Sequence, residues 1–308
     1  MNAKMAAMLD RPVKHQSFEG VGLRRKVVDN LATVLVSMSV LLALIPLVWV
    51  LYSVVTKGYK ALTAAEWFTN SQSGMTAFVE GGGVYHAIVG TVLQALVCAI
   101  ISIPIGVLVA VYLVEYGGGT KLGKLTTFMV DILTGVPSIV AALFIYALWV
   151  ATLGFQRTGF AVSLALVLLM IPVIVRSTEE MLRIVPMDLR EASYALGIPK
   201  WKTIVRIVIP TALSGILTGV MLSLARVMGE TAPLLVLVGY AQAMNFDMFG
   251  GFMGSLPGMM YDQIGAGAGA NEVPTDRMWG AALTLVLLIA LLNVAARLCA
   301  KFFAPKKV

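Results

Sequence analysis

The sequence predicts an all-α integral membrane protein with six transmembrane helices. Of its 308 residues, 59% are hydrophobic and only 13% are charged, and the mean hydropathy of +0.88 lies far above that of soluble globular proteins. The apolar residues gather into six long runs separated by shorter polar segments. Because backbone polar groups inside a bilayer must bond within the protein, such runs are expected to form helices.

The distribution of basic residues predicts the orientation of these helices. With six spans, about 18 of the Lys and Arg residues lie on one side of the membrane, together with both termini, and about four lie on the other. The positive-inside rule makes the basic side cytoplasmic, so both termini are expected in the cytoplasm. We therefore attribute the net charge of +7 to membrane topology, with lipid around the helices, and expect no nucleic-acid partner.

The first part of the chain is expected to form a tail, a span and an outer loop. Residues 1–30 are a polar, basic cytoplasmic tail, and 31–86 comprise the first transmembrane helix, Leu31 to Val55, and the loop after it. This apolar run of roughly 25 residues is longer than the apolar region of a signal peptide. The second span covers Ala87 to Val114 and leads into a short inner loop.

Two further spans precede the central polar segment. The third runs from Leu125 to Val150, and the fourth from Phe160 to Val175. The fourth is short and contains Pro172, so we expect it to continue as a helix into the cytoplasm as far as Arg183.

The remaining elements alternate across the membrane in the same way. Residues 186–210 are a polar, basic segment that must face the cytoplasm. The fifth span covers 211–240, an outer loop 241–277 and the sixth span 278–300, and a second cytoplasmic basic tail occupies 301–308. Within the outer loop, residues 264–271 are rich in Gly and Ala and are expected to be mobile.

The polar segment 186–210 is predicted to begin with a helix that a partner can hold. Asp188 is placed to cap its first amides and Glu191 to complete a capping-box-like pair, while Gly197 ends it. Residues at helical spacing then form one narrow apolar face. They are Leu189, Ala192, Ser193 and Leu196.

This segment resembles the EAA loop of ABC importer permeases, which reads E-A-A, three residues, G, nine residues, I-x-L-P. Glu191-Ala192-Ser193, Gly197 and Ile207 to Pro210 fit this spacing, with Ser193 in place of the second Ala and Ile209 in place of the Leu. The resemblance implies that the helix docks into a separate ATP-binding subunit and transmits its closure. The residues to which it assigns ATPase coupling are Asp188, Glu191, Ala192, Ser193, Gly197 and Pro210. The alternative is an amphipathic helix resting on lipid headgroups.

Two charged residues stand four apart within the fifth span and so share one face of a helix. Arg226 and Glu230 lie near the middle of the membrane, where a charge costs about 2.5–3.5 kcal/mol on insertion scales. They are therefore expected to face the bundle interior or a wet cavity. We favour a site on the path of a charged substrate, and the alternative is an ion pair that only fixes packing.

The residues after this pair suit an oxyanion. Thr231 adds a hydroxyl, and Pro233 removes a backbone hydrogen bond, so the helix can kink or break here. Freed backbone groups together with an arginine fork can bind a tetrahedral anion through several directed bonds.

Ala225 to Leu235 closely resembles the A-R-x-x-G-E-T-A-P-L-L signature of phosphate permeases of the PstA type. Asp131 to Val140, which contains Pro137 and Ser138, and Pro172 to Leu182 resemble two further segments of that family. The resemblance covers roughly 87–300.

The resemblance implies a MetI-like bundle, the type I ABC importer permease fold, with 87–300 as its core and 186–210 as its coupling loop. It implies inorganic phosphate as substrate and a location in the bacterial inner or plasma membrane. The implied partners are a second permease of the PstC type, a PstB-type ATPase dimer and an extracytoplasmic PstS-type receptor. The implied substrate path contains Arg226, Glu230, Thr231, Pro233, Pro137 and Ser138, although a kinked helix would also explain the last two.

The chain itself is not expected to be an enzyme or to bind a cofactor. Residues 118–125 (GGTKLGKL) fall short of a nucleotide-binding loop because Leu replaces the Mg²⁺-binding Ser or Thr and no strand precedes them. ATP and Mg²⁺ are therefore assigned to the partner ATPase. No side-chain cluster has metal-ligand spacing, and Cys98 and Cys299 are expected to be buried and inert.

Three other functions remain open at this point. The chain could carry another oxyanion, such as phosphonate or sulfate. It could be an ion-coupled secondary transporter that uses Glu230 and Asp131, although it has no evident inverted repeat. A non-transporting membrane sensor would leave Arg226 and Glu230 without a role beyond packing.

Overall fold

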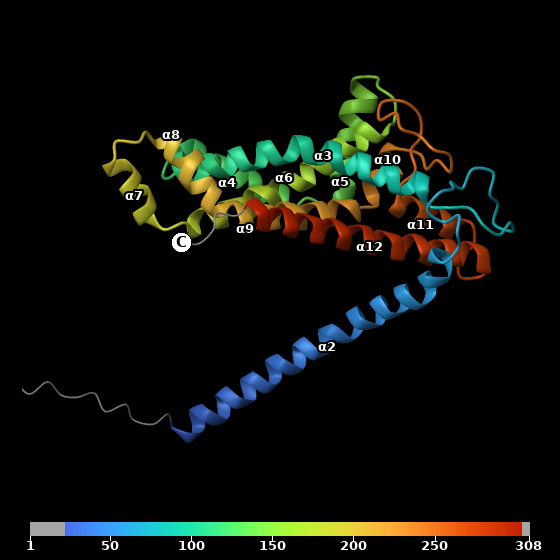
Figure 1. The fold of residues 1–308 in the computed structure, drawn as a ribbon, viewed down its shortest axis with the longest axis horizontal. Coiled ribbons are helices and arrows are strands. Elements are labelled where there is room, and N and C mark those ends of the chain that lie inside the picture. The colour runs from blue at the N-terminus through green and yellow to red at the C-terminus, as the bar shows by residue number, and fades with distance from the viewer. Residues whose placement is uncertain (1–21, 304–308) are drawn as a thin grey trace, which may run out of the picture. The chain divides into compact units, whose positions relative to one another are not determined.

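The computed structural model describes residues 22–303, with side chains to residue 298 (Figure 1). The regular secondary structure of the described range is all helical, and the only extended pairing in that range is an isolated bridge between Ala268 and Asn271. The helices are α2 (Leu23–Leu62), α3 (Tyr85–Val111), α4 (Lys121–Thr134), α5 (Ser138–Ile145), α6 (Gly159–Ile184), α7 (Met187–Ala195), α8 (Lys200–Thr203), α9 (Ile209–Met228), α10 (Ala232–Leu237), α11 (Leu256–Gly265) and α12 (Glu272–Phe303). Three short π-helical turns continue α3, α5 and α8, namely η1 (Tyr112–Tyr116), η2 (Tyr146–Thr152) and η3 (Ile204–Val208).

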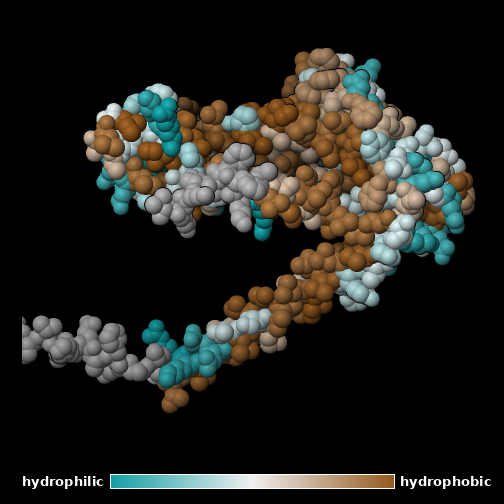
Figure 2. All heavy atoms as spheres, in the orientation of Figure 1, coloured by the Kyte–Doolittle hydropathy of each residue, from teal (hydrophilic) through white to brown (hydrophobic). Residues whose placement is uncertain are grey.

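The all-α membrane architecture predicted from composition is confirmed. Five helical stretches in the described residues are long and apolar enough to cross a membrane, and the count reaches six if the bent pair α4 and α5 forms one span. Figure 2 shows apolar side chains along the body of the α3 to α12 bundle and polar ones gathered at its two ends. The cytoplasmic location of both termini stays a prediction, and the tail residues 1–21 and 304–308 lie outside the described range.

The chain divides into two compact units, residues 1–52 and residues 53–308. In the first unit the helix begins at Leu23 and not at Leu31, so the end of the predicted tail is helical. The second unit begins with the last turns of α2 and contains everything after them. There Gly58 lies so close to the Trp279 carbonyl of α12 that a Cβ would come within 2.6 Å of it.

Helix α6 forms the centre of the second unit. It packs against α3 on one side and α9 on the other and also contacts α4, α5 and α10. Its apolar stretch is more deeply buried than those of α3, α9 and α12. As expected, it continues past Pro172 through Arg183, to Ile184.

Small residues allow these helices to approach closely. A Cβ on Gly106 of α3 would lie 2.6 Å from Ile174 of α6. On α9, Gly215 and Gly219 face Met181 and Ser177 of α6 in the same way. These two glycines, four residues apart, form a small-x-x-x-small pattern that packs inside this chain.

The predicted third span is not one straight helix. Helix α4 ends at Thr134 and α5 begins at Ser138, and the two axes differ by 106°. Pro137 has an extended backbone, with φ −61° and ψ 142°. Proline lacks an amide hydrogen and disfavours a helical conformation of the residue before it, so α4 does not continue through this position.

An additional helix lies in the second outer loop. Ser255 caps α11 by accepting a hydrogen bond of 3.2 Å from the Gly258 amide, and Pro257 lies in the first turn. A capping Ser followed by Pro is a recognisable start signal that our sequence interpretation passed over. The Gly/Ala-rich segment after α11 forms tight turns with φ of +95° at Gly267 and Gly269, and its mobility stays a prediction.

Candidate functional site

The fifth predicted span breaks at the level of its charged pair. Helix α9 ends at Met228, and the Gly229 and Glu230 amides donate to the carbonyls of Arg226 and Val227 at 3.1 Å each. The expected kink or break is thus present, but Arg226 and Glu230 do not share the face of a continuous helix. The turn still brings Arg226 Nε to 3.9 Å from Glu230 Oε1.

The Arg226 guanidinium is only loosely engaged. Its side chain is 56% exposed, whereas that of Glu230 is 19% exposed. Within the described part of the chain, Arg226 has no ion pair besides this one at 3.9 Å, and no hydrogen bond from its guanidinium is present. An arginine held in this way can turn its fork to another anion.

Thr231 and Pro233 restart the helix on the far side of the break. The Thr231 carbonyl accepts hydrogen bonds from the amides of Leu234 and Leu235 at 3.1 and 3.3 Å. Pro233 is buried in the first turn of α10, where its missing amide hydrogen costs nothing.

Glu230 borders a cavity of about 10 Å³ between α3, α9 and α11, which is close to the size of one water. Gln94 of α3 lines the same cavity, is 3% exposed and has an amide nitrogen with no partner among the described atoms. Our sequence interpretation missed Gln94, because an isolated Gln in an apolar run gives no local signal.

The two broken spans meet in the structure. Helix α5, which begins at Ser138 just after Pro137, packs directly against α10, which begins at Ala232. Both helices also contact α6. The structure thus joins the elements that carry the two groups of predicted path residues.

Four charged side chains link α4 to the end of α6. Glu179 is buried and accepts hydrogen bonds from Arg176 at 2.8 Å and Arg183 at 2.7 Å. Arg176 also pairs with Asp131 of α4. The i, i+3 and i, i+4 spacing of the three α6 residues is a readable signal that the sequence interpretation left unused.

Helix α7, the first part of the coupling loop, is tied to the end of α3 by a buried ion pair. Arg190 donates from Nε and Nη2 to Glu115 Oε1 at 3.1 and 2.9 Å, and the two side chains are only 8% and 5% exposed. Arg190 also donates to the carbonyls of Leu182 and Val185 at 3.0 and 2.7 Å. Because 75 residues separate Arg190 from Glu115, no local pattern predicts the pair.

The coupling loop differs from the sequence prediction in two details. The N-cap of α7 is Pro186, so Asp188 lies inside the first turn and the expected capping box with Glu191 does not form. Ser193 is buried, with its hydroxyl 2.7 Å from that of Thr203 in α8, so it does not belong to an outward docking face.

The predicted end of the loop's first helix is confirmed. Gly197 ends the helix with φ +75°, a conformation that favours glycine. On the exposed side lie Asp188, Leu189, Glu191, Ala192 and Leu196. Pro210 lies in the first turn of α9, so the loop leads directly into the helix that carries Arg226.

Residues 118–125, which we did not expect to bind a nucleotide, lead from the end of α3 into α4. They follow the π-turn of α3, and Thr120 caps α4 through the Gly123 amide at 2.9 Å. No group of three or more metal-ligating side chains occurs between residues 22 and 298. Cys98 is buried with its sulfur 3.5 Å from that of Met170, and the Cys299 side chain lies outside the described residues.

Sequence comparisons identify the family. Residues 102–308 match the family described as binding-protein-dependent transport system inner membrane component. The phosphate transport system permease protein PstA of Mycobacterium leprae is 57% identical over 93% of each chain. PstA 1 of Mycobacterium tuberculosis H37Rv is 54% identical over 97% of this chain and 96% of its own. This chain belongs to the PstA-type permease family.

Solved structures agree with this assignment at the level of fold. A chain of a bacterial ABC transporter for the import of alginate superposes with a TM-score of 0.59 over 91% of this PstA-type chain and 100% of its own, at 14% identity. A chain of the MetNI methionine ABC transporter gives 0.56 over 72% and 94%, at 20% identity. The predicted MetI-like permease fold is therefore confirmed. The family match and the apolar helices confirm a multi-pass, inner-membrane location.

Proposed function

We propose that this chain is a permease subunit of an ATP-driven phosphate importer and forms half of its translocation path. The observation that carries the proposal is the break between α9 and α10, where Arg226 and Glu230 meet at 3.9 Å. The break lies in a chain more than half identical to phosphate permeases along nearly its whole length.

The geometry of the break suits transient binding of an oxyanion. A guanidinium presents several donors to a tetrahedral anion, and the exposed Arg226 is bonded only weakly to Glu230. When no anion is present, Glu230 partly neutralises the arginine. Phosphate therefore replaces a carboxylate at the guanidinium and is not bound too tightly to be released. Thr231 adds a hydroxyl beside the pair.

Helices α5 and α10, which follow the two breaks, both pack against α6. This packing supports a translocation path whose walls can move. At an existing bend, a helix can change its angle without breaking helical hydrogen bonds. Helices α5 and α10 can therefore each tilt against α6 as a unit. Pro137 and Ser138 then act as the hinge of one segment, and Thr231 and Pro233 as the hinge of the other. Alternating tilts open the region of Arg226 to either face of the membrane.

The energy for import comes from outside this chain. With the cell interior negative, each anionic charge imported costs about 2.3 kcal/mol per 100 mV. A PstB-type ATPase dimer, which binds ATP and Mg²⁺, is the proposed source, and its docking site is the exposed side of α7 with Asp188, Glu191 and Ala192. The buried pair of Arg190 with Glu115 makes α7 move together with α3.

The remaining proposed partners complete the importer. A PstC-type permease supplies the other half of the path, and a PstS-type receptor delivers phosphate on the extracytoplasmic side. Ser193, Gly197 and Pro210 contribute to coupling by shaping the loop, because Ser193 is buried against Thr203 and the other two set the backbone.

Reconstitution tests this function. The tagged chain is co-expressed with the proposed partners, purified and placed in liposomes that contain ATP, with receptor and labelled phosphate outside. We expect copurification of an ATPase and ATP-dependent phosphate uptake that sulfate and phosphonate do not inhibit. Copurification without phosphate uptake, or equal inhibition by sulfate, would refute the assignment of phosphate.

A further inference from the structure

We propose that a cavity between α10 and α11 is the outer vestibule of the translocation path and that Arg157 binds the anion in it. The inference rests on the proposed function and adds to it a second anion-binding residue and a route. The EAA loop contributes no residue to this cavity, and the Arg226 segment contributes only Leu234 and Leu235 at its end.

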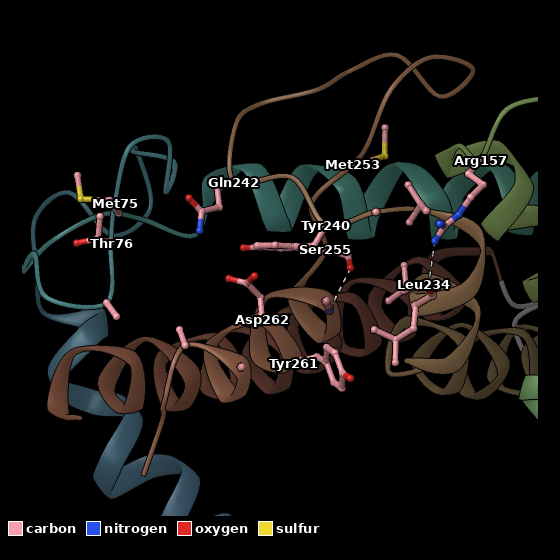
Figure 3. A pocket seen from close by; sticks show the side chains of 17 residues that line it. Met75, Thr76, Arg157, Leu234, Tyr240, Gln242, Met253, Ser255, Tyr261 and Asp262 are labelled. Carbon is pink, nitrogen blue, oxygen red and sulfur yellow. Dashed lines mark hydrogen bonds between the residues drawn. The ribbon is translucent and has the colours of Figure 1, made fainter. Parts of the chain in front are cut away.

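The cavity has a volume of about 550 Å³, many times the roughly 30 Å³ that one water occupies in the liquid, so a hydrated anion fits. Figure 3 shows Arg157 at one end of it, beside Leu234, and Asp262 well away from it, with Tyr240 and Ser255 between the two. All four of these polar side chains line the cavity.

Arg157 lacks the partners that an arginine needs in such a place. Its Nη2 donates to the Leu235 carbonyl at 3.2 Å, but its Nε is buried and unbonded. No carboxylate forms an ion pair with it in the described part of the chain. A partly buried guanidinium with one hydrogen bond and no carboxylate partner is stabilised by an anion that enters the cavity.

The charges of the wall give the vestibule a direction. Because Asp262 lies apart from Arg157, its carboxylate repels an anion from one part of the cavity while the guanidinium attracts it to the other. The end that attracts the anion is the end bordered by Leu234, at the start of α10.

Leu234 and Ser255 connect this cavity to the site formed by Arg226 and Glu230. Both residues line the vestibule and also the small cavity that Glu230 and Gln94 share. They therefore form the neck between the two spaces. Beyond the neck, the unbonded amide of Gln94 is the next donor an anion meets before it reaches Arg226.

The first test measures transport efficiency in the reconstituted complex. Arg157→Gln should lower the phosphate imported per ATP hydrolysed by about tenfold, the size expected for one charge-assisted hydrogen bond. Arg157→Lys should retain most of it, and receptor-stimulated ATPase activity should remain in both. An unchanged ratio in Arg157→Gln would overturn the proposal, whereas absence of uptake by the wild type would refute the proposed function instead.

The second test does not depend on transport. In a chain carrying Cys98→Ala and Cys299→Ser, Tyr261→Cys places a thiol on the exposed wall of the vestibule. We expect an anionic thiosulfonate reagent to react faster than a cationic one, phosphate to slow the reaction, and Arg157→Gln to reduce the anion preference about tenfold. Equal rates for the two reagents, or no effect of Arg157→Gln on a complex that assembles normally, would refute an anion-binding vestibule.

Discussion

The buried pair of Arg190 with Glu115 offers a quantitative prediction about how the coupling helix is held. Arg190→Met removes four hydrogen bonds, two to Glu115 and one each to the carbonyls of Leu182 and Val185. It also leaves the Glu115 carboxylate, which is 5% exposed, without its cation. Loss of one partner of a buried ion pair costs about 3–5 kcal/mol.

The effect should be local because Arg190 lies at one end of the bundle, on the short helix α7. Since about 1.4 kcal/mol corresponds to a factor of ten, 3–5 kcal/mol should accelerate amide exchange of residues 187–196 by roughly 100- to 4000-fold. The protection that α7 has in the wild type sets the upper limit. Hydrogen exchange measured by mass spectrometry on the detergent-solubilised complex reports this directly.

Two further variants separate the ion pair from general damage. Arg190→Met combined with Glu115→Leu removes the unpaired charge and should restore much of the protection, although two carbonyls stay unbonded at about 1–3 kcal/mol each. Arg206→Met changes an exposed arginine on η3 and should have no effect. An acceleration of less than about threefold in Arg190→Met would refute the idea that this pair holds the coupling helix.

Two other predictions concern the two ends of the bundle. Glu191→Lys reverses a charge on the exposed side of α7 and should abolish phosphate uptake while the isolated permease stays folded; a complex with normal ATPase stimulation and uptake would argue against docking there. Burial raises the pKa of Asp262 above its ordinary value, despite hydrogen bonds from Gln242 and Gln263. The contribution of Asp262 to the free energy of unfolding is therefore present below the unfolded-state pKa. It is lost as the pH rises through the folded-state pKa. The thermal stability of Asp262→Asn should therefore lack the fall with rising pH that the wild type shows across this interval, and identical pH profiles would contradict the assignment.

Much of the architecture follows from local sequence. Apolar run length predicts the spans, and the turn chemistry of Gly197 predicts the end of α7. The break near Pro233 was also predictable, because proline cannot bond within the helix. The same reasoning at Pro137 indicated only a kink, since the sharpness of the 106° bend depends on how α5 packs against α10.

The features that sequence reasoning missed are long-range. Glu115 meets Arg190 only after η1 and α7 are folded beside each other, and Gln94 meets Glu230 only across the α3 and α9 contact. Arg157 lies in a short loop before α6 with no motif around it. Its unbonded Nε becomes visible only when α10 and α11 enclose the vestibule.

Uptake of phosphate by Arg226→Ala in proteoliposomes tests the central claim most directly. The matched control is Arg297→Ala, which removes an exposed arginine near the end of α12. We predict that Arg226→Ala assembles, binds the receptor and hydrolyses ATP but imports no phosphate, while Arg297→Ala imports it at the wild-type rate. Near-normal phosphate uptake by Arg226→Ala would show that the break between α9 and α10 is not on the path.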